Sequence, residues 1–474
     1  MRWISSFVAA LLAAACISPR QSDSATGSLA LVSVSVVDVE SGQVLTDQTV
    51  LIVGREIRAV APDGKVDLPG AVRVVNARGR FLIPGLWDMH VHLTPFGRAV
   101  LPLIVAYGVT AVRDAGSTDS IFRWREEVAT GQRLGPRIWS PGQMLTQARA
   151  VDQGPEWQGV ASPAASRQAV AARKAAGADF LKLQDSFMER ALWSAAAAEA
   201  AVRGLPIVGH APVDVPLTEA IGLGLHSIEH TMGLPLALSA SGGRLRERVM
   251  RAEGASARYT ALYQADLEAL ATLDTSRLSA VATLMRGRGV ALSPTLTDLR
   301  AMATSPSGRW SQDPRLATIP PAVRDLWRGD AAGRTPAQTL YLQRLYERIP
   351  AIVLALHRAG VTILAGTDAG AMYDFPGSDL HSELWHMVQA GLTPLEALRT
   401  ATLTPARFMN VADSLGSIRS GKLADLVLLD GNPLADIRNT ERISGVVANG
   451  RYLDRPALDL LLAEARRAAS TSSQ

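Results

Sequence analysis

The chain has 474 residues, of which 47% are hydrophobic and 19% charged, and its formal net charge is +4. This length fits one large domain plus a smaller one, and the apolar content argues against extensive disorder. The basic residues are scattered along the chain rather than clustered, so the sequence carries no footprint of nucleic-acid binding.

The first residues predict an export signal. Arg2 precedes an apolar run from Ile4 to Ala15, which suits a signal peptide and is too short to span a bilayer. The run ends at Cys16, the only cysteine, in a string similar to a bacterial lipobox; cleavage after an ordinary A-x-A site is the alternative. We expect residues 1–15 to be a signal peptide and residues 16–28 a tether. The exported bacterial protein would be periplasmic or, with a lipidated Cys16, anchored to a membrane.

Residues 29–80 predict β structure. Leu31 to Val39 alternates as a strand does, and Thr49–Val53 and Glu56–Ala61 form two more strands around a turn at Gly54. Val72–Asn76 is a fourth short strand.

From Phe81 onward, strands alternate with alanine-rich amphipathic stretches such as Pro163–Ala176. This alternation predicts a closed parallel (β/α)₈ TIM barrel over residues 81–410, with helical elaborations over residues 235–288. The eight predicted barrel strands are Phe81–His92, Thr110–Asp114, Arg137–Pro141, Ala178–Leu183, Pro206–His210, His226–His230, Val290–Thr295 and Thr362–Asp368.

Residues 411–454 return to β structure, with a strand at Leu423–Leu429 and a final hairpin around Asn449-Gly450. We expect residues 29–80 and 411–454 to combine into one small β-sandwich beside the α/β barrel. Residues 455–474 predict a terminal helix that ends in a polar tail.

The end of the first barrel strand carries His90 and His92. Alternate residues of a strand point the same way, so both imidazoles face the barrel interior at the end where active sites of this fold lie. Two such imidazoles can bind one metal ion, although an isolated H-x-H pair is a weak signal.

Three further side chains end barrel strands. His210 and His230 close consecutive strands, so their imidazoles should be neighbours, whereas His226 lies deeper on the same strand as His230 and is expected to be a core residue. Asp368 closes the eighth strand. It could pair with a cation, cap a helix, or bind a metal and accept a proton from the bound water.

Lys182 is the only charged residue in the apolar stretch that follows Asp179, in a chain with only four lysines. Its amine could reach solvent or pair with a carboxylate, since an unpaired buried ammonium is costly. Alternatively, carbon dioxide could carbamylate the amine. The carbamate could then bridge two cations at the roughly 3.5–4 Å spacing of two-metal sites.

The order H-x-H, Lys, His, His, Asp resembles the amidohydrolase superfamily, most closely the subgroup of imidazolonepropionases and bacterial Xaa-Pro or Xaa-Arg dipeptidases. The resemblance extends from Leu29 to Arg451. It includes the segments Gly391–Leu398 and Gly416–Val427, which are similar to C-terminal signatures of that group.

This resemblance implies a hydroxide that bridges two divalent metal ions, with Zn²⁺ favoured by the imidazole and carboxylate-like donors. It implies that Asp368 binds metal and transfers protons. The implied ligands are His90, His92 and Asp368 for the more buried metal, His210 and His230 for the second, and carbamylated Lys182 between them.

The reaction implied is cleavage of an amide-type C–N bond in a small molecule, with a dipeptide, an N-acyl amino acid or a cyclic amide as candidate substrates. His381, in the loop after the eighth strand, is a candidate substrate contact. Related dipeptidases carry a carboxylate-binding tyrosine where this chain has Gly233, so recognition of a C-terminal carboxylate does not follow from the resemblance.

Two alternatives remain. One is a mononuclear cyclic-amide hydrolase similar to imidazolonepropionase, with Lys182 unmodified. The other is a non-catalytic exported lipoprotein that binds a ligand. A homo-oligomer is compatible with the sequence.

Overall fold

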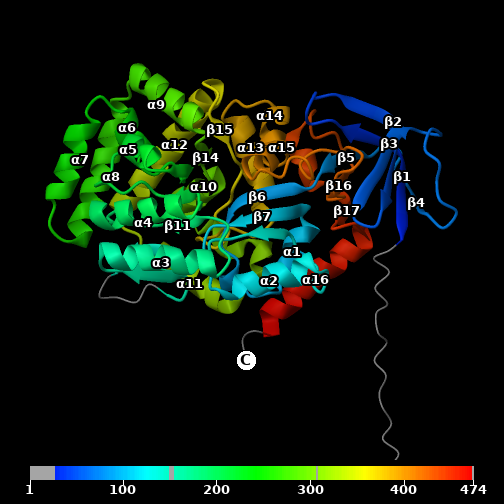
Figure 1. Ribbon diagram of the computed structural model, residues 1–474, viewed down its shortest axis with the longest axis horizontal. Helices are drawn as coiled ribbons and strands as arrows, with labels where there is room; N and C mark the ends of the chain where they lie inside the picture. The colour runs from blue at the N-terminus through cyan, green and yellow to red at the C-terminus, as the bar shows by residue number, and fades with distance from the viewer. Residues whose placement is uncertain (1–26, 149–153, 306–307, 472–474) are drawn as a thin grey trace, which may run out of the picture.

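The computed structural model describes residues 27–148, 154–305 and 308–471. They form a parallel α/β barrel beside a second sheet that contains both the first and the last described strands (Figure 1). The predicted fold class, a TIM barrel with a small β domain built from both ends of the chain, is confirmed. The predicted signal peptide and Cys16 lie outside the described residues. No helix within the described ranges has the length and hydropathy that a membrane span requires.

The second sheet joins the two ends of the chain in the order β18-β17-β16-β5-β1-β2-β3, with β4 paired to β1. Figure 1 shows the blue N-terminal strands beside the red C-terminal ones. The strands are β1 (Ser28–Val37), β2 (Val44–Val53), β3 (Glu56–Pro62), β4 (Arg73–Asn76), β5 (Phe81–Pro84), β16 (Leu426–Leu429), β17 (Ile443–Ala448) and β18 (Arg451–Asp454).

Strand β16 shows how this sheet attaches to the barrel. Leu426 and Leu428 belong to the sheet's own hydrophobic core, whereas Val427 and Leu429 belong to the large core shared with the barrel. Because successive side chains of a strand point to opposite faces, the two faces of β16 serve the two domains. The sheet is therefore held to the barrel by apolar packing across one face.

The predicted first barrel strand, Phe81–His92, is two strands, and its first part is a correction. Strand β5 pairs with β1 and β16 in the second sheet, and only β6 (Leu86–Val91) pairs with β7 in the barrel. The change of sheet occurs at Gly85, where a Cβ atom would lie 2.0 Å from Oγ1 of Thr110. A glycine permits this close approach of the backbone to the neighbouring strand.

The barrel has eight strand positions, and the third is divided: β8 pairs with β7, and β9 pairs with β11. An additional strand, β10 (Trp157–Val160), pairs with β9. The barrel closes between β6 and the eighth strand, where Met89 N donates to Ala365 O at 2.8 Å. The remaining barrel strands are β7 (Val109–Asp114), β8 (Arg137–Trp139), β9 (Met144–Gln147), β11 (Leu181–Leu183), β12 (Ile207–Gly209), β13 (Leu225–Glu229), β14 (Ala291–Ser293) and β15 (Thr362–Ile363).

Helices cover the barrel between its strands. The expected elaboration over residues 235–288 consists of α6 (Leu234–Leu238), α7 (Gly242–Arg251), α8 (Ala255–Ala271) and α9 (Thr275–Arg288). A second long insertion, which the sequence did not predict, follows β14 and contains α10 (Leu296–Thr304), α11 (Pro321–Ala332) and α12 (Pro336–Arg358). Helix α12 begins at a capping box in which Thr335 and Gln338 satisfy each other's backbone N–H groups.

The other helices follow the chain. Between barrel strands these are α1 (Val100–Ala106), α2 (Ser120–Ala129), α3 (Pro163–Ala175), α4 (Arg190–Val202) and α5 (Leu217–Gly222). After the eighth strand come α13 (Asp379–Gln389), α14 (Pro394–Thr400), α15 (Leu403–Phe408) and α16 (Arg455–Thr471). The terminal α16 packs against α1.

Leu82 tests the joint between the two ends of the chain, because it lies fully buried on β5 between β1 and β16. Leu82→Ala should lower the free energy of unfolding by about 2–5 kcal/mol, since it leaves a cavity in the sheet's core. Val74→Ala, in the same sheet but 52% exposed, is the matched control and should cost under about 1 kcal/mol. Chemical denaturation measures both, and equal losses would contradict a core at this joint.

Candidate metal centre

Asp368 lies at the meeting point of two histidines. Nε2 of His90 and Nε2 of His92 are each 3.2 Å from Oδ1 of Asp368. Both histidines come from the end of β6, and Asp368 follows β15, the neighbouring strand across the closure of the barrel. The closure therefore brings together side chains from the first and the last barrel strands, which lie far apart in the sequence.

His230 and His210 complete the histidine group. Nε2 of His230 is 3.9 Å from Oδ2 of Asp368, and ligand atoms of His90, His230 and Asp368 lie within 4.8 Å of one another. The ring of His230 is 4.4 Å from that of His90 and 5.3 Å from that of His210. All four imidazoles are thus neighbours at the C-terminal end of the barrel, as the ends of their strands predict.

Lys182 lies in the middle of β11 and is completely buried. Within the described residues its Nζ has no hydrogen-bond partner, so it neither reaches solvent nor pairs directly with a carboxylate. Burial lowers the pKa of Lys182 to about 8, although the charges of Glu229 and Asp368 act in the opposite direction. The amine is therefore closer to its neutral form at physiological pH than an ordinary lysine.

The donor atoms at this centre fit a divalent cation. Nε2 of His90, Nε2 of His210, Nζ of Lys182 and Oδ1 of Asp368 are all buried, and none has a hydrogen-bond partner in the described part of the chain. Buried polar atoms are normally hydrogen-bonded, and such exceptions call for an explanation. Imidazole nitrogens and carboxylate oxygens are ligands of Zn²⁺ and related metals, so an ion would satisfy these atoms together.

The pKa shifts of His210, His230 and Asp368 also favour metal binding. Burial lowers the pKa of His230 to about 3 and that of His210 well below its ordinary value, so both are neutral at physiological pH. Burial raises the pKa of Asp368, but the nearby His230 and His90 outweigh it and hold that pKa well below its ordinary value. His210 and His230 thus present neutral imidazoles and Asp368 presents an ionised carboxylate, the protonation states that metals require.

Glu229, which the sequence did not single out, fixes the orientation of His90. Its Oε2 accepts a hydrogen bond from Nδ1 of His90 at 2.5 Å, which leaves Nε2 directed at Asp368. Ser227 donates to Oε1 of Glu229 at 2.5 Å. A carboxylate that holds a histidine in this way sets its tautomer and increases its strength as a ligand.

The charge of Glu229 is balanced by Arg113 from β7, whose Nη2 lies 2.8 and 2.9 Å from the two carboxylate oxygens. Nε of Arg113 also donates to the carbonyl of Met89 at 2.6 Å. Burial raises the pKa of Glu229, but Arg113 and His90 outweigh it and keep that pKa well below 4.5. The signal for this pair in the sequence was a charged residue within each of two predicted barrel strands, since buried charges need partners.

Other contacts hold the remaining donors. Nδ1 of His92 donates to Gly116 O at 2.8 Å, and Nδ1 of His230 lies 2.9 Å from Oγ1 of Thr295. The hydroxyl of Thr367, next to Asp368, donates to Oδ2 of Asp88 on β6 at 2.7 Å. His92 and His230 are thus positioned by neighbours on other segments, and the segment of Asp368 is tied to β6.

The backbone at the centre is unusual. Asp368 has φ +61°, His230 has φ +58° and Thr295 has φ +46°, all in the left-handed region that residues other than glycine rarely adopt. Such conformations persist where the surrounding structure enforces them, and they are concentrated at functional sites. Here they occur at two proposed ligands and at Thr295, whose hydroxyl contacts Nδ1 of His230.

The structure does not support a substrate contact at His381. Its Nδ1 lies 3.0 Å from Oγ1 of Thr440, and its Nε2 lies 3.0 Å from the carbonyl of Tyr107, just before β7 begins. The ring is buried at the N-terminal side of the barrel, opposite the histidine group, and both nitrogens are in use. His226 also differs from the core residue expected: it is half-buried and stacks on Phe408.

A family model described as the amidohydrolase family matches residues 81–453. Among curated proteins, ochratoxinase from Aspergillus niger is 41% identical over 106 residues, which are 21% of each protein. Adenine deaminase 3 from Rhizobium meliloti (strain 1021) is 37% identical over 73 residues, 14% of this chain and 12% of that protein. These matches span about a fifth or less of the length of the curated relatives.

Solved structures match over nearly the whole chain. A bottromycin amidohydrolase is 24% identical with a TM-score of 0.71, covering 93% of this chain and 90% of that one. A Xaa-Pro dipeptidase with bound methionine is 21% identical with a TM-score of 0.65, covering 90% of this chain and 100% of that one. At these identities the likeness establishes the fold.

Arg113→Met should lower the free energy of unfolding by about 3–5 kcal/mol, because it leaves the Glu229 carboxylate buried without its cation. The double variant Arg113→Met/Glu229→Gln removes both charges and should recover part of that loss in chemical denaturation. A double variant less stable than the single one would contradict a charge balance between these residues.

The same pair predicts a dependence on pH. Because the pKa of Glu229 is lowered in the folded chain, the unfolded chain binds this proton first as the pH falls below 4.5. The contribution of Glu229 to stability is therefore present above that pH and lost on acidification. The wild type should lose stability between about pH 5 and 3 more steeply than the double variant.

Proposed function

The chain belongs to the amidohydrolase family, and from this premise we propose that it is a metal-dependent hydrolase that cleaves an amide-type C–N bond. The observation that carries the proposal is the convergence of His90 Nε2, His210 Nε2 and Asp368 Oδ1, all buried and without hydrogen-bond partners among the described residues. The names of its relatives, a dipeptidase, an amidohydrolase and a deaminase, also describe reactions at C–N bonds.

The donor set fits two divalent cations, with Zn²⁺ as the first choice. His90, His92 and Asp368 would hold one cation, and His210 and His230 the other, with Lys182 between them. When bound, such cations lower the pKa of a shared water towards ~7 and polarise the carbonyl of the substrate.

Asp368 is the group that moves protons in this proposal. Its low pKa keeps it ionised at neutral pH, so it can accept a proton from the attacking water. The protonated carboxyl can then donate that proton to the leaving amine as the C–N bond breaks. Its position between the Nε2 atoms of His90 and His92 holds the carboxylate in place for both transfers.

Lys182 would serve as a carbamate. Its neutral amine attacks the carbon of carbon dioxide, a C–N bond forms while one C=O π bond opens onto oxygen, and one proton is released to solvent, so that a neutral amine becomes an anionic carbamate. The burial of Nζ without a partner among the described residues and the lowered pKa support this reaction, because only the neutral amine is nucleophilic. Arginine could not replace it, since the guanidinium remains protonated.

Candidate substrates are a dipeptide, an N-acyl amino acid or a cyclic amide, and a panel of these with the metal-loaded protein tests the proposal. A mononuclear hydrolase with unmodified Lys182 is the second candidate. His90, His230 and Asp368 form one close group, and His210 lies beyond it with its ring 5.3 Å from that of His230, which supports a second cation on that side. A protein that only binds a ligand would show no turnover with any member of the panel.

Lys182→Ala should remove the link between the two cations, lower the metal content from two ions per chain and abolish turnover. Lys182→Arg should do the same, because a fixed positive charge ~4 Å from a cation costs on the order of 4 kcal/mol per unit charge at an effective dielectric of ~20. Elemental analysis and turnover measure both effects. Added short carboxylic acids should restore part of the activity of Lys182→Ala.

Lys174→Ala is the matched control, because Lys174 is an exposed lysine on α3 and should leave metal content and turnover unchanged. If one metal ion per chain supports full activity, or if Lys182→Arg retains both metal and turnover, the binuclear centre is wrong and the mononuclear version replaces it.

We also propose that the protein is exported and anchored through a lipid on Cys16. The apolar run before this cysteine supports the proposal. Mass spectrometry of the native protein should find Cys16 as a lipidated first residue. A mature N-terminus beyond Cys16, or an unmodified Cys16, would exclude the anchor while leaving export through an ordinary signal peptide.

A further inference from the structure

A narrow pocket lies next to the strand ends that carry His210 and His230. Its wall includes Ala211, which follows His210 in the chain, and Met232 and Gly233, which follow His230. The pocket therefore begins where these two strand ends stop. Gly233 has φ +82°, and a Cβ atom there would contact Cβ of Ala211 at 3.4 Å, so the absence of a side chain keeps this wall open.

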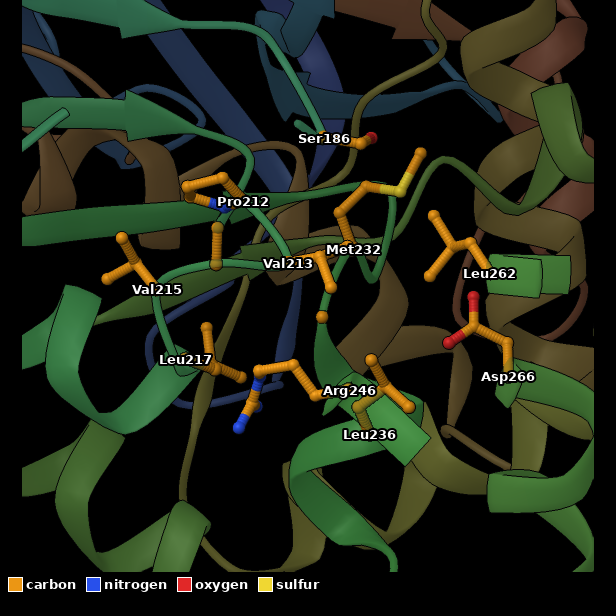
Figure 2. Close-up of a pocket in the computed structure, with 12 residues that line it drawn as sticks. Ser186, Pro212, Val213, Val215, Leu217, Met232, Leu236, Arg246, Leu262 and Asp266 are labelled. Carbon is orange, nitrogen blue, oxygen red and sulfur yellow. The ribbon is translucent and has the colours of Figure 1, made fainter. Parts of the chain in front are cut away.

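The opposite wall comes from the insertion after β13. Helix α7 contributes Arg246 and helix α8 contributes Leu262 and Asp266 (Figure 2). Most of the other lining side chains are apolar, among them Val213 and Leu236. The pocket thus offers an apolar surface with one cationic and one acidic group. None of the proposed metal ligands lines it.

Arg246 differs from the other arginines of α7. Arg244 and Arg248 both form ion pairs with Glu268, and Arg251 pairs with Glu247. Nε of Arg246 is buried, and the described residues supply neither a hydrogen-bond partner for it nor an ion pair for its guanidinium. A guanidinium presents several donors in a fixed plane that matches a carboxylate, so an unpaired one beside a pocket has the geometry to receive an anion.

The carboxylate-bearing residues around Arg246 are already engaged by another arginine. Arg190 forms an ion pair with Glu219, and its Nη2 donates to the carbonyl of Asp214 at 2.6 Å, while its own backbone N–H donates to Oδ2 of Asp214 at 2.9 Å. Burial lowers the pKa of Arg246, and the charge of Arg190 lowers it further. Glu219 and Asp214 act on that pKa in the opposite direction, but neither forms an ion pair with Arg246.

Asp266 marks the other side of the pocket. Figure 2 shows its carboxyl group next to Leu262, across the pocket from the side where Arg246 lies beside Leu217. The hydroxyl of Tyr341 donates to Oδ2 of Asp266 at 2.9 Å, so this carboxyl is held by the protein. Arg246 and Asp266 form no ion pair with each other, and apolar side chains line the pocket between them.

We propose that this pocket is the specificity subsite of the enzyme, in which Arg246 binds a carboxylate of the substrate and the apolar wall receives an adjoining aliphatic group. The inference rests on the proposed function and narrows its substrate class to N-acyl amino acids or dipeptides that carry a free carboxylate beside a hydrophobic side chain. Cyclic amides without a carboxylate do not use Arg246.

A matched pair of substrates tests the subsite. N-acetyl-L-leucine and N-acetyl-L-leucinamide contain the same acetyl amide and the same side chain, but only the first carries a carboxylate. The metal-loaded wild type should prefer the acid, and Arg246→Met should lower kcat/KM for the acid by about 10- to 100-fold, mainly through KM, without changing that for the amide. Arg246→Lys should restore part of the preference.

Arg248→Met is the matched control on the same helix, and it should leave both substrates unaffected. A wild type without preference, or an Arg246→Met variant that loses both activities equally or neither, overturns the subsite. If the wild type hydrolyses neither compound, calorimetric binding of N-acetyl-L-leucine decides. Binding that Arg246→Met weakens supports the subsite and counts against the proposed reaction on this class, whereas no binding overturns the subsite.

Discussion

The buried contact between Glu229 and His90 is the interaction on which the rest of the centre depends. It directs one ring nitrogen of His90 toward Asp368, and it exists only because Arg113 neutralises the carboxylate inside the barrel. An isolated carboxylate at this depth would take up a proton or destabilise the fold. The contacts of the Glu229 carboxylate therefore connect three strands, β6, β7 and β13. The same carboxylate orients His90, a proposed metal ligand.

The barrel supplies the rigidity that this arrangement requires. His230 and Asp368 are both held at positive φ, a conformation that a loosely packed chain would leave. The hydroxyl of Thr367 on Asp88 ties the eighth strand to the first at the point where the ligands meet. Packing of the second sheet through one face of β16 adds support from outside the barrel, since Val427 and Leu429 enter the shared core. Stability and ligand geometry thus arise from the same contacts.

The alternation of side chains along strands helped to predict the fold and the six candidate ligands from the sequence. A residue at the end of a barrel strand has a defined direction, so the order of the strands placed His90, His92 and Asp368 at one end of the barrel, and the resemblance to the amidohydrolase superfamily supplied their roles as ligands. Outside the barrel strands, the sequence did not predict the direction of a side chain correctly. His381 lies on a helix after a loop, where distance along the chain says nothing about orientation, and it turned to Thr440 and the backbone. The sequence did not indicate a role for Glu229, because that role depends on its contacts with His90 and Arg113 on other strands.

Arg246 shows a further limit of sequence reading. Four arginines occur within α7, and nothing in their order distinguishes the one that lacks a glutamate partner among the described residues. That distinction arises only when α7 and α8 pack over the strand ends. The ligand-bearing strand ends and the pocket-forming insertion are consequently separate parts of the molecule, joined at Ala211 and Gly233. Such a division allows the insertion to vary the substrate while the charges that hold His90 remain unchanged.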